Sequence, residues 1–322
     1  MREIKINEIV GYKIGHAQNE AGATGCTVIL CEKGAVAGVD VRGGAPATRE
    51  TELLNPLNMA ERIHAVLLSG GSAFGLDAAA GVMAFLEERN IGFDVGVGMV
   101  PLVCGAALFD LTVGDSRCRP DKAMGYAASE NAWAAGEVAE GNRGAGTGAS
   151  VGKYLGKERM MKSGLGIYAL AAGGLRCGAV VAVNALGDVL DADTLKPLAG
   201  ILNSEKTGLD CTAALMYRDI GKRPEVFPGN TTIGCVITNG KLTKTGANKA
   251  ASMAQDGYAR VIRPVHTSVD GDTIFVMASG EVEVAVDTLG TLAAEVMARA
   301  INRAVLTARA AYGLKSAGDI LA

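Results

Sequence analysis

The chain has 322 residues, of which 49% are apolar and 20% are charged, and its formal net charge is −3. This balance excludes a mainly disordered chain, because disordered chains have few apolar residues and a high net charge. Aromatic residues make up only 4% and the 31 basic residues form no stripe, so we expect no nucleic-acid partner.

The first part of the chain predicts strands and tight turns. Two β-rich runs, 25–31 and 35–41, flank a turn signal at 32–34, and a third apolar run follows at 65–68. The apolar spacing from 76 to 86 then predicts a helix. A further helix is expected over 123–138.

The second part predicts a longer series of elements. Two strands are expected within 164–191, and the charged, proline-containing stretch 203–230 predicts a linker. After the linker, the elements expected are a strand at 231–238, a helix at 244–262, a strand pair at 274–278 and 282–286, and a helix through 289–304 capped by Gly313. This irregular alternation favours packed sheets covered by helices over a uniform βαβ repeat.

Cysteine and histidine usage gives no sign of a metal or disulfide framework. The seven cysteines and three histidines lie far apart and form no ligand spacing, so we expect neither a metal nor a cofactor. The N-terminal residues lack the apolar core of a secretory signal, and no uncharged apolar run is long enough to cross a bilayer. We therefore expect a cytoplasmic protein with no membrane partner.

The segment Ser69–Gly75 places glycines and serines between a predicted strand and a predicted helix. An anion-binding turn is one interpretation, but no lysine or arginine lies between Arg62 and Arg89 to support a phosphate. A serine-nucleophile elbow is another, but the spacing around Ser72 differs from G-x-S-x-G. A turn of close backbone approach, or a wall of a substrate pocket, fits the pattern better.

The segment Pro228–Gly234 admits two interpretations. Thr231 and Thr232 open a strand, for which β-branched residues are well suited. Alternatively, the bond between Asn230 and Thr231 is cut, and the Thr231 hydroxyl becomes a nucleophile with its own α-amine as the base. Such a pair needs no histidine, because an α-amine titrates near pH 8. Asparagine also tolerates unusual backbone angles at the cleavage position.

Seven blocks of the sequence, in this order, carry a resemblance to a known family. They are residues 38–51, 69–77, 140–148, 162–166, 181–184, 229–234 and 270–275. Over nearly its whole length the chain resembles the DmpA-like L-aminopeptidase/D-amino-acid-esterase and β-aminopeptidase family. Its members are self-cleaving N-terminal-nucleophile hydrolases related in fold to ornithine acetyltransferase.

The resemblance implies a four-layer α/β/β/α sandwich that assembles as a tetramer of αβ units. Residues 1–322 would form a single catalytic domain, processed into an α chain, 1–230, and a β chain, 231–322. The family's cleaved bond matches Asn230–Thr231 and its nucleophile matches Thr231. The implied activity is hydrolysis of amino acid amides, esters or short peptides from the amino terminus.

The resemblance also implies the remaining site residues. Asn184 matches the family's oxyanion donor, although a strand-end turn residue is the alternative. Asp270-Gly271-Asp272 matches a Ser-Gly-acid element that positions the nucleophile, although this tripeptide is also a common turn before a strand. The substrate pocket is assigned to Ser69, Gly70, Gly71, Ser72, Gly146 and Thr147.

Two positions depart from the family pattern. An aspartate stands at 270 where serine is usual, and the family's tyrosine near the oxyanion has no equivalent in 100–108. Arg42 and Arg49 are candidates for substrate or intersubunit contacts, with a packed or exposed arginine as the alternative. Two other functions stay open: acyl transfer of the ornithine-acetyltransferase type, and non-catalytic binding of a small molecule on the same scaffold.

Overall fold

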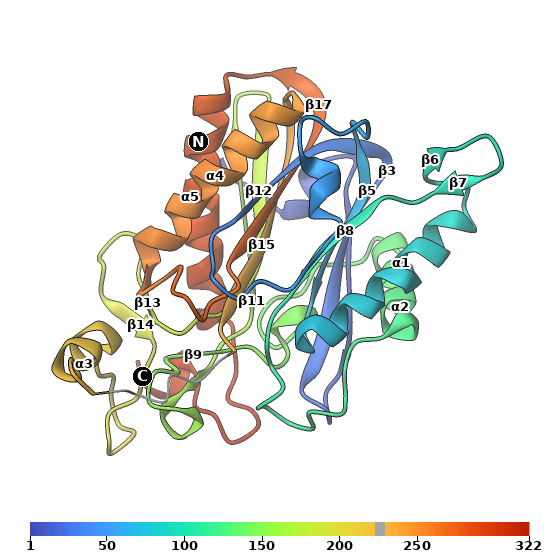
Figure 1. Ribbon diagram of the computed structural model, residues 1–322. Coiled ribbons are helices and arrows are strands. Elements are labelled where there is room, and N and C mark those ends of the chain that lie inside the picture. The colour runs from blue at the N-terminus through green and yellow to red at the C-terminus, as the bar shows by residue number, and fades with distance from the viewer. Residues whose placement is uncertain (223–228, 322) are drawn as a thin grey trace.

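Among the described residues, 1–222 and 229–321, most of the longer strands form one continuous ten-stranded arrangement, and the other strands form three small sheets (Figure 1). The ten-stranded arrangement folds over into two sheets that lie face to face between two pairs of helices. The structure is a computed structural model. One core cluster fills the space between the sheets, and two others lie between each sheet and its helix pair. The order of layers is helix, sheet, sheet, helix, so the expected α/β/β/α class is confirmed.

The strands of the described residues are β1 (Arg2–Glu3), β2 (Lys13–Asn19), β3 (Thr24–Val41), β4 (Thr48–Arg49), β5 (Ile63–Ser69), β6 (Phe93–Asp94), β7 (Met99–Val100), β8 (Val103–Ala107), β9 (Ser150–Val151), β10 (Met161–Lys162), β11 (Leu165–Ala172), β12 (Leu175–Asn184), β13 (Asp188–Leu190), β14 (Pro197–Ala199), β15 (Thr231–Lys241), β16 (Ile262–Arg263) and β17 (Thr273–Glu283). The α-helices there are α1 (Ala78–Glu87), α2 (Lys122–Trp133), α3 (Thr212–Arg218), α4 (Lys244–Val261) and α5 (Val286–Leu306).

The long strand β3 belongs to both sheets. The first sheet also contains β1, β11, β12, β15 and β17, and the second also contains β2, β4, β5 and β8. Its first part pairs with β2 and β5, and its last part, from Val36, pairs with β17. The pairing with β5 shifts between Leu30 and Ala35, where Gly34 has φ +71°. The turn predicted at 32–34 is therefore wrong: the glycine interrupts the register, and the chain continues forward into the other sheet.

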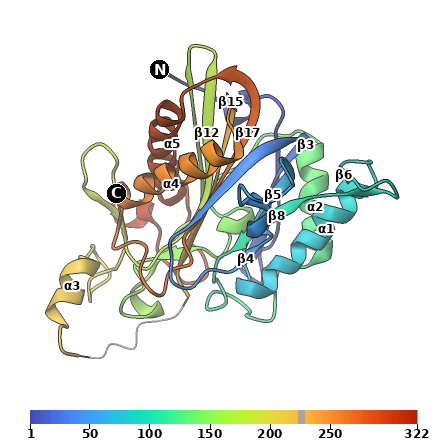
Figure 2. The same ribbon diagram turned by 45° about the horizontal axis from the view of Figure 1, so that its top comes forward.

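The central strands are apolar along their whole length because both of their faces are buried. In β12, Val181 and Val183 face the helices α4 and α5, whereas Val180 and Ala182 face the second sheet. The same alternation continues in β15 and β17. Figure 2 shows α4 and α5 on one side of the strands and α1 and α2 on the other.

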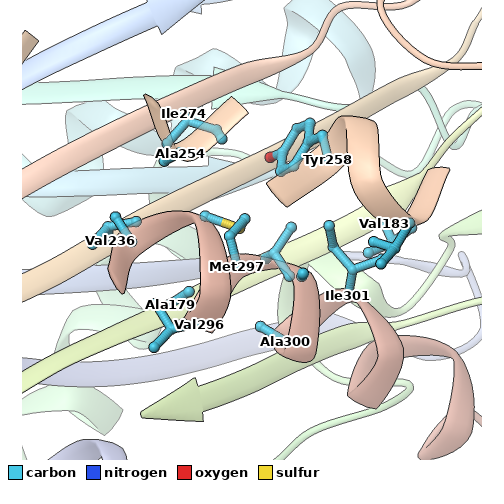
Figure 3. Close-up of a cluster of buried hydrophobic side chains, with 14 of the residues drawn as sticks. Ala179, Val183, Val236, Ala254, Tyr258, Ile274, Val296, Met297, Ala300 and Ile301 are labelled. Atoms are coloured by element: carbon cyan, nitrogen blue, oxygen red, sulfur yellow. The ribbon is translucent and has the colours of Figure 1, made fainter. Parts of the chain in front are cut away.

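Small residues bring the α4–α5 pair close to the first sheet. Tyr258 of α4 and Met297 of α5 lie among small and branched side chains of the strands (Figure 3). A Cβ added to Gly166 of β11 would lie only 1.9 Å from the carbonyl oxygen of Ala300 in α5. The high glycine content thus partly reflects backbones in direct contact.

Three other predicted boundaries are wrong. The pair 274–278 and 282–286 is one strand, β17, which keeps its pairing with β15 as far as Glu283. Gly313 caps no helix, because α5 already ends at Leu306. The N–H of the next residue, Thr307, donates to the Arg303 carbonyl and closes the last turn of that helix. The helix expected over 123–138 ends at Trp133.

The stretch 203–230, predicted as a linker, includes a helix. It contains α3 (Thr212–Arg218), whose first N–H donates to the buried carboxylate of Asp188. Residues 223–228 of this stretch lie outside the described residues. In the described part of the chain, no helix is both long and apolar enough to span a bilayer.

Candidate active site

Thr231 begins β15 in the middle of the first sheet and is buried, at 3% exposure. Thr231 pairs with Asn184 of the neighbouring strand β12, and β17 runs parallel to β15 on its other side. The Thr231 hydroxyl donates a hydrogen bond to the carbonyl oxygen of Asn230, the residue before it. The hydroxyl is therefore already directed at the peptide bond for which the sequence predicts cleavage.

The unusual backbone angle before this bond lies at Gly229. Gly229 has φ +128°, whereas Asn230 is not among the residues with positive φ. A Cβ added to Gly229 would lie 2.4 Å from the ring carbon Cδ1 of Phe109. Glycine is required at 229 for both reasons. The unusual backbone angle that the sequence predicted at Asn230 thus occurs one residue earlier.

A backbone donor also points at the Asn230 carbonyl. The Gly271 N–H donates to that oxygen at 2.9 Å, within a parallel bridge between Asn230 and Asp270. A Cβ at Gly271 would lie 2.8 Å from the Thr231 hydroxyl oxygen. The absence of a side chain at 271 therefore lets the donor, the carbonyl and the hydroxyl meet.

The two aspartates after β16 have different surroundings. Asp272 Oδ1 accepts from the Thr232 N–H at 2.8 Å, and Oδ2 accepts from the backbone N–H of His266 at 3.0 Å and from its Nδ1 at 2.9 Å. Asp270 accepts from the backbone N–H groups of Leu186 and Thr267. Burial, together with the negative charge of Asp272, raises the pKa of Asp270 to about 6.

Asn184 is held by a buried lysine. Lys153 Nζ donates to the Asn184 side-chain oxygen at 2.6 Å, to its carbonyl at 3.0 Å and to the Gly229 carbonyl at 3.2 Å. The Asn184 Nδ2 donates to the Phe109 carbonyl at 2.9 Å. Burial lowers the pKa of Lys153 to about 7, although the charges of Asp270 and Asp110 oppose this.

Sequence analysis did not identify Lys153 or His266 as site residues. The one signal for Lys153 is a single lysine within the otherwise uncharged run Gly144–Gly156. His266 precedes Asp272 by six residues, with no spacing that marks it out. Both are recognised only when distant segments meet.

The segment 42–46 fixes the loop that carries the aspartates. The N–H groups of Arg42 and Gly43 both donate to the Asp272 carbonyl, and the Ala45 N–H donates to the Asp270 carbonyl at 2.8 Å. A Cβ added to Gly43 would lie 2.2 Å from the Asp270 carbonyl oxygen. This explains why the block 38–51 is rich in glycine at this point.

The arginines of that block contact the protein itself. The Arg42 guanidinium donates to the Asp40 carboxylate and to Ser252, and Arg49 contacts the sulfur of Met83. Their assignment to substrate or intersubunit contacts stays a prediction.

The predicted pocket segment Ser69–Ser72 lies beside Asp110. The Gly71 N–H donates to Asp110 Oδ1 at 2.7 Å, and Thr24 donates to Oδ2 at 2.8 Å. Burial raises the pKa of Asp110 to about 6. Because Asp110 follows Phe109, whose carbonyl accepts from Asn184, this segment is linked to the site through two adjacent residues.

Gly146 and Thr147 are buried inside their own loop. The Gly146 carbonyl accepts from Lys162 Nζ at 3.0 Å, and the Thr147 hydroxyl donates to Gly144. Lys162 also donates to Ala149 and Ser163, and burial lowers its pKa to about 7. In the described part of the chain, neither Gly146 nor Thr147 forms a hydrogen bond with Thr231, so their role in binding stays a prediction.

Comparison with known proteins gives a consistent result. The family model described as peptidase family S58 matches residues 5–317. An uncharacterized aminopeptidase of Mycobacterium leprae is 40% identical over 96% of this chain and 92% of its own length. A 6-aminohexanoate-oligomer endohydrolase of Kocuria sp. is 33% identical over 94% of this chain and 86% of its own length.

Two solved structures share the fold. The L-aminopeptidase D-Ala-esterase/amidase of Ochrobactrum anthropi, described as a variant of the Ntn hydrolase fold, matches with a TM-score of 0.68 and 19% identity. The match covers 94% of this chain and 86% of that one. A Burkholderia β-aminopeptidase gives a TM-score of 0.66 and 21% identity over 99% of this chain and 93% of its own.

The extent of these matches confirms the family predicted from the seven sequence blocks. The family model covers nearly the whole chain, and the similar proteins from Mycobacterium and Kocuria are matched over most of their own lengths. The chain therefore belongs to peptidase family S58 and is a hydrolase.

Proposed function

We propose that this hydrolase processes itself between Asn230 and Thr231 and then uses Thr231 as an N-terminal nucleophile. The observation that carries the proposal is the convergence on one carbonyl group. The Asn230 oxygen accepts from both the Thr231 hydroxyl and the Gly271 N–H. A nucleophile and an oxyanion donor thus meet at the bond to be cut.

In the processing step, Thr231 Oγ attacks the carbonyl carbon of Asn230. The hydroxyl proton passes to the Thr231 nitrogen, the C–N bond breaks, and an ester joins Asn230 to the threonine oxygen. Water then hydrolyses the ester, which leaves a carboxylate on Asn230 and a free α-amine on Thr231. The Gly271 N–H stabilises the negative oxygen formed on the way, because it already points there.

In turnover, the free α-amine accepts the Thr231 hydroxyl proton as the oxygen attacks a substrate carbonyl, and returns it to the leaving amine. Asn184 donates to the developing oxyanion once its Nδ2 leaves the Phe109 carbonyl. Lys153 holds the Asn184 side-chain oxygen and so fixes the amide beside Thr231. Asp272 anchors the strand at Thr232, next to the nucleophile.

The proposed substrates are amides, esters or short peptides of amino acids. The relatives named as aminopeptidases and as 6-aminohexanoate-oligomer endohydrolases support an amide substrate with an amine-bearing chain. Acyl transfer to an amino acid acceptor, as in ornithine acetyltransferases, differs only in whether water or an amine takes the acyl group. A direct comparison of acceptors separates the two reactions.

The test compares the wild type with Thr231→Ala and Thr231→Ser by intact mass and N-terminal sequencing. We expect two chains from the wild type, with the smaller beginning at Thr231, and one chain from Thr231→Ala. Thr231→Ser keeps a hydroxyl and should still be cut. Aminoacyl p-nitroanilides should be hydrolysed without an acceptor, whereas transfer from acetylornithine to glutamate should be absent. An active wild type that stays a single chain would disprove the nucleophile assignment.

A further inference from the structure

We propose that His266 is a positioning residue for the Thr231 nucleophile, acting through Asp272; this inference rests on the proposed function of Thr231. The chain of contacts runs from the His266 imidazole to Asp272 and from Asp272 to the Thr232 N–H. Its last member is the residue that follows the nucleophile.

Contacts with Asp272 and Tyr258 fix the position of the His266 imidazole. Its Nδ1 lies 2.9 Å from Asp272 Oδ2, and its ring stacks on Tyr258 of α4, with the ring centres 6.1 Å apart and 25° between the planes. The residue has φ +56°, a conformation that histidine adopts more readily than most residues. The His266 side chain is only 18% exposed.

The hydrogen-bond pattern defines which ring nitrogen carries the proton. Both oxygens of the Asp272 carboxylate accept from backbone N–H groups, so the carboxylate is the acceptor here. Nδ1 is therefore a further donor to Oδ2. The other ring nitrogen, Nε2, is buried and has no hydrogen-bond partner among the described residues. A proton on Nδ1 rather than on Nε2 leaves no buried ring N–H without an acceptor.

Processing changes what holds the nucleophile in place. In the uncut chain, Thr231 is fixed on both sides by peptide bonds. After the cut it is a chain end, held by its pairing with Asn184 of β12 and, on its C-terminal side, by the bond from the Thr232 N–H to Asp272. We therefore expect His266 to matter more for turnover than for the first cut.

The charged and titratable groups around this pair come from several elements. Tyr258 of α4 stacks on the imidazole, and Asp270 lies on the same loop as Asp272. The charge of Asp270 in turn raises the pKa of Lys153 against the effect of burial. Among these groups of the described residues, the His266 imidazole is the one that donates to the Asp272 carboxylate.

The experiment uses two substitutions that both tolerate a positive φ. His266→Gly removes the imidazole donor, whereas His266→Asn keeps an N–H donor close to the position of Nδ1. The readouts are the extent of self-cleavage by intact mass, and kcat and KM of the cut enzyme on an aminoacyl p-nitroanilide. Added imidazole, which can fill the space left in His266→Gly, is a third readout, and thermal unfolding reports any loss of stability.

We expect His266→Gly to be cut and to lose kcat by about tenfold or more, with KM within about twofold, because a hydrogen bond to a charged group is lost. His266→Asn, or His266→Gly with imidazole, should recover most of kcat. Equal losses in both variants without rescue, or wild-type kcat in His266→Gly, would overturn the inference.

Failure of the proposed function gives a different result. If Thr231→Ala is still cut at the same bond or stays active, the nucleophile is misassigned, whatever the His266 variants do. If Thr231→Ala is uncut and inactive but His266→Gly behaves as the wild type, only the role of His266 is wrong.

Discussion

At the scale of single residues, two buried lysines make similar hydrogen bonds, one beside Thr231 and the other within a loop of the scaffold. Lys153 and Lys162 are both buried, and each donates to three oxygens. Lys153 holds Asn184 and Gly229, beside the proposed cleavage position. Lys162 instead holds the carbonyls of the loop around Gly146. The pair offers a matched comparison of site and scaffold.

Replacing Lys153 by Met should impair chemistry more than stability alone explains. Without Lys153, the Asn184 side-chain oxygen keeps only the Ser150 N–H as a donor among the described residues, and the amide is held less firmly. We therefore expect kcat to fall by about a hundredfold, the usual cost of a lost oxyanion donor. The rate of p-nitroanilide hydrolysis measures this. Lys162→Met is the control and should lower Tm with less effect on kcat. Equal kinetic losses in the two variants would refute the distinction.

The two lysines also predict how stability depends on pH. Burial lowers the pKa of each to about 7, below the value near 10.4 of a free lysine. Between these values the unfolded chain binds more protons at the two lysines, so their contribution to the free energy of unfolding should rise with pH from about 7 to 9. Denaturant unfolding of the wild type and Lys162→Met measures this. The variant should show a smaller rise, and an unchanged slope would contradict the prediction.

At the scale of elements, the site lies where three strands meet at their ends. The end of β12, the start of β15 and the approach to β17 bring Asn184, Thr231 and Asp272 together. The loop 42–46, which follows β3, holds the approach to β17 in place. These contacts leave no room for a side chain at Gly271.

Gly271→Ala should therefore slow self-cleavage with little change in overall fold. The added Cβ would lie 2.8 Å from both the Thr231 hydroxyl oxygen and the Ala45 carbonyl, so one of them must move. Overpacking of this kind costs about 1–3 kcal/mol, and we expect processing to slow by about tenfold or more. Time courses by intact mass give the rate. Gly136→Ala, where a Cβ meets nothing within 4 Å, is the control, and equal rates in the two variants would count against this packing argument.

At the scale of the whole molecule, the proposed cut divides a continuous sheet. β15 and β17 would belong to the fragment 231–322, yet β15 pairs with β12 and β17 pairs with β3 of the other fragment. The helices α4 and α5 of the same fragment cover the first sheet. The two fragments thus share one core and two hydrogen-bonded ladders.

The fragments should stay together after processing. We expect them to elute together on size exclusion in native buffer, to separate only in denaturant, and to unfold in a single thermal transition. The physical reason is that neither fragment buries its apolar strand faces alone. Separation of the fragments in native buffer, or two well-resolved transitions, would show that they are independent units.

Local patterns in the sequence predict part of the fold and part of the candidate site. The apolar run at 231–238 and the helical spacing that follows it predict β15 and α4, because burial and periodicity act over neighbouring residues. The ordered blocks around Asn184, Thr231 and Asp270–Asp272 also identify the family. These features depend on short segments, so a single sequence carries them.

Only the tertiary structure decided the rest. Whether the chain reverses or continues at Gly34 depends on β17 pairing with the far end of β3, more than 200 residues away. Lys153 reaches Asn184 and Gly229, and His266 reaches Asp272 from a conformation that the stacked Tyr258 supports. Such contacts join segments that local propensity treats separately, because the hydrogen bonds and buried charges that select them exist only after the sheets have packed.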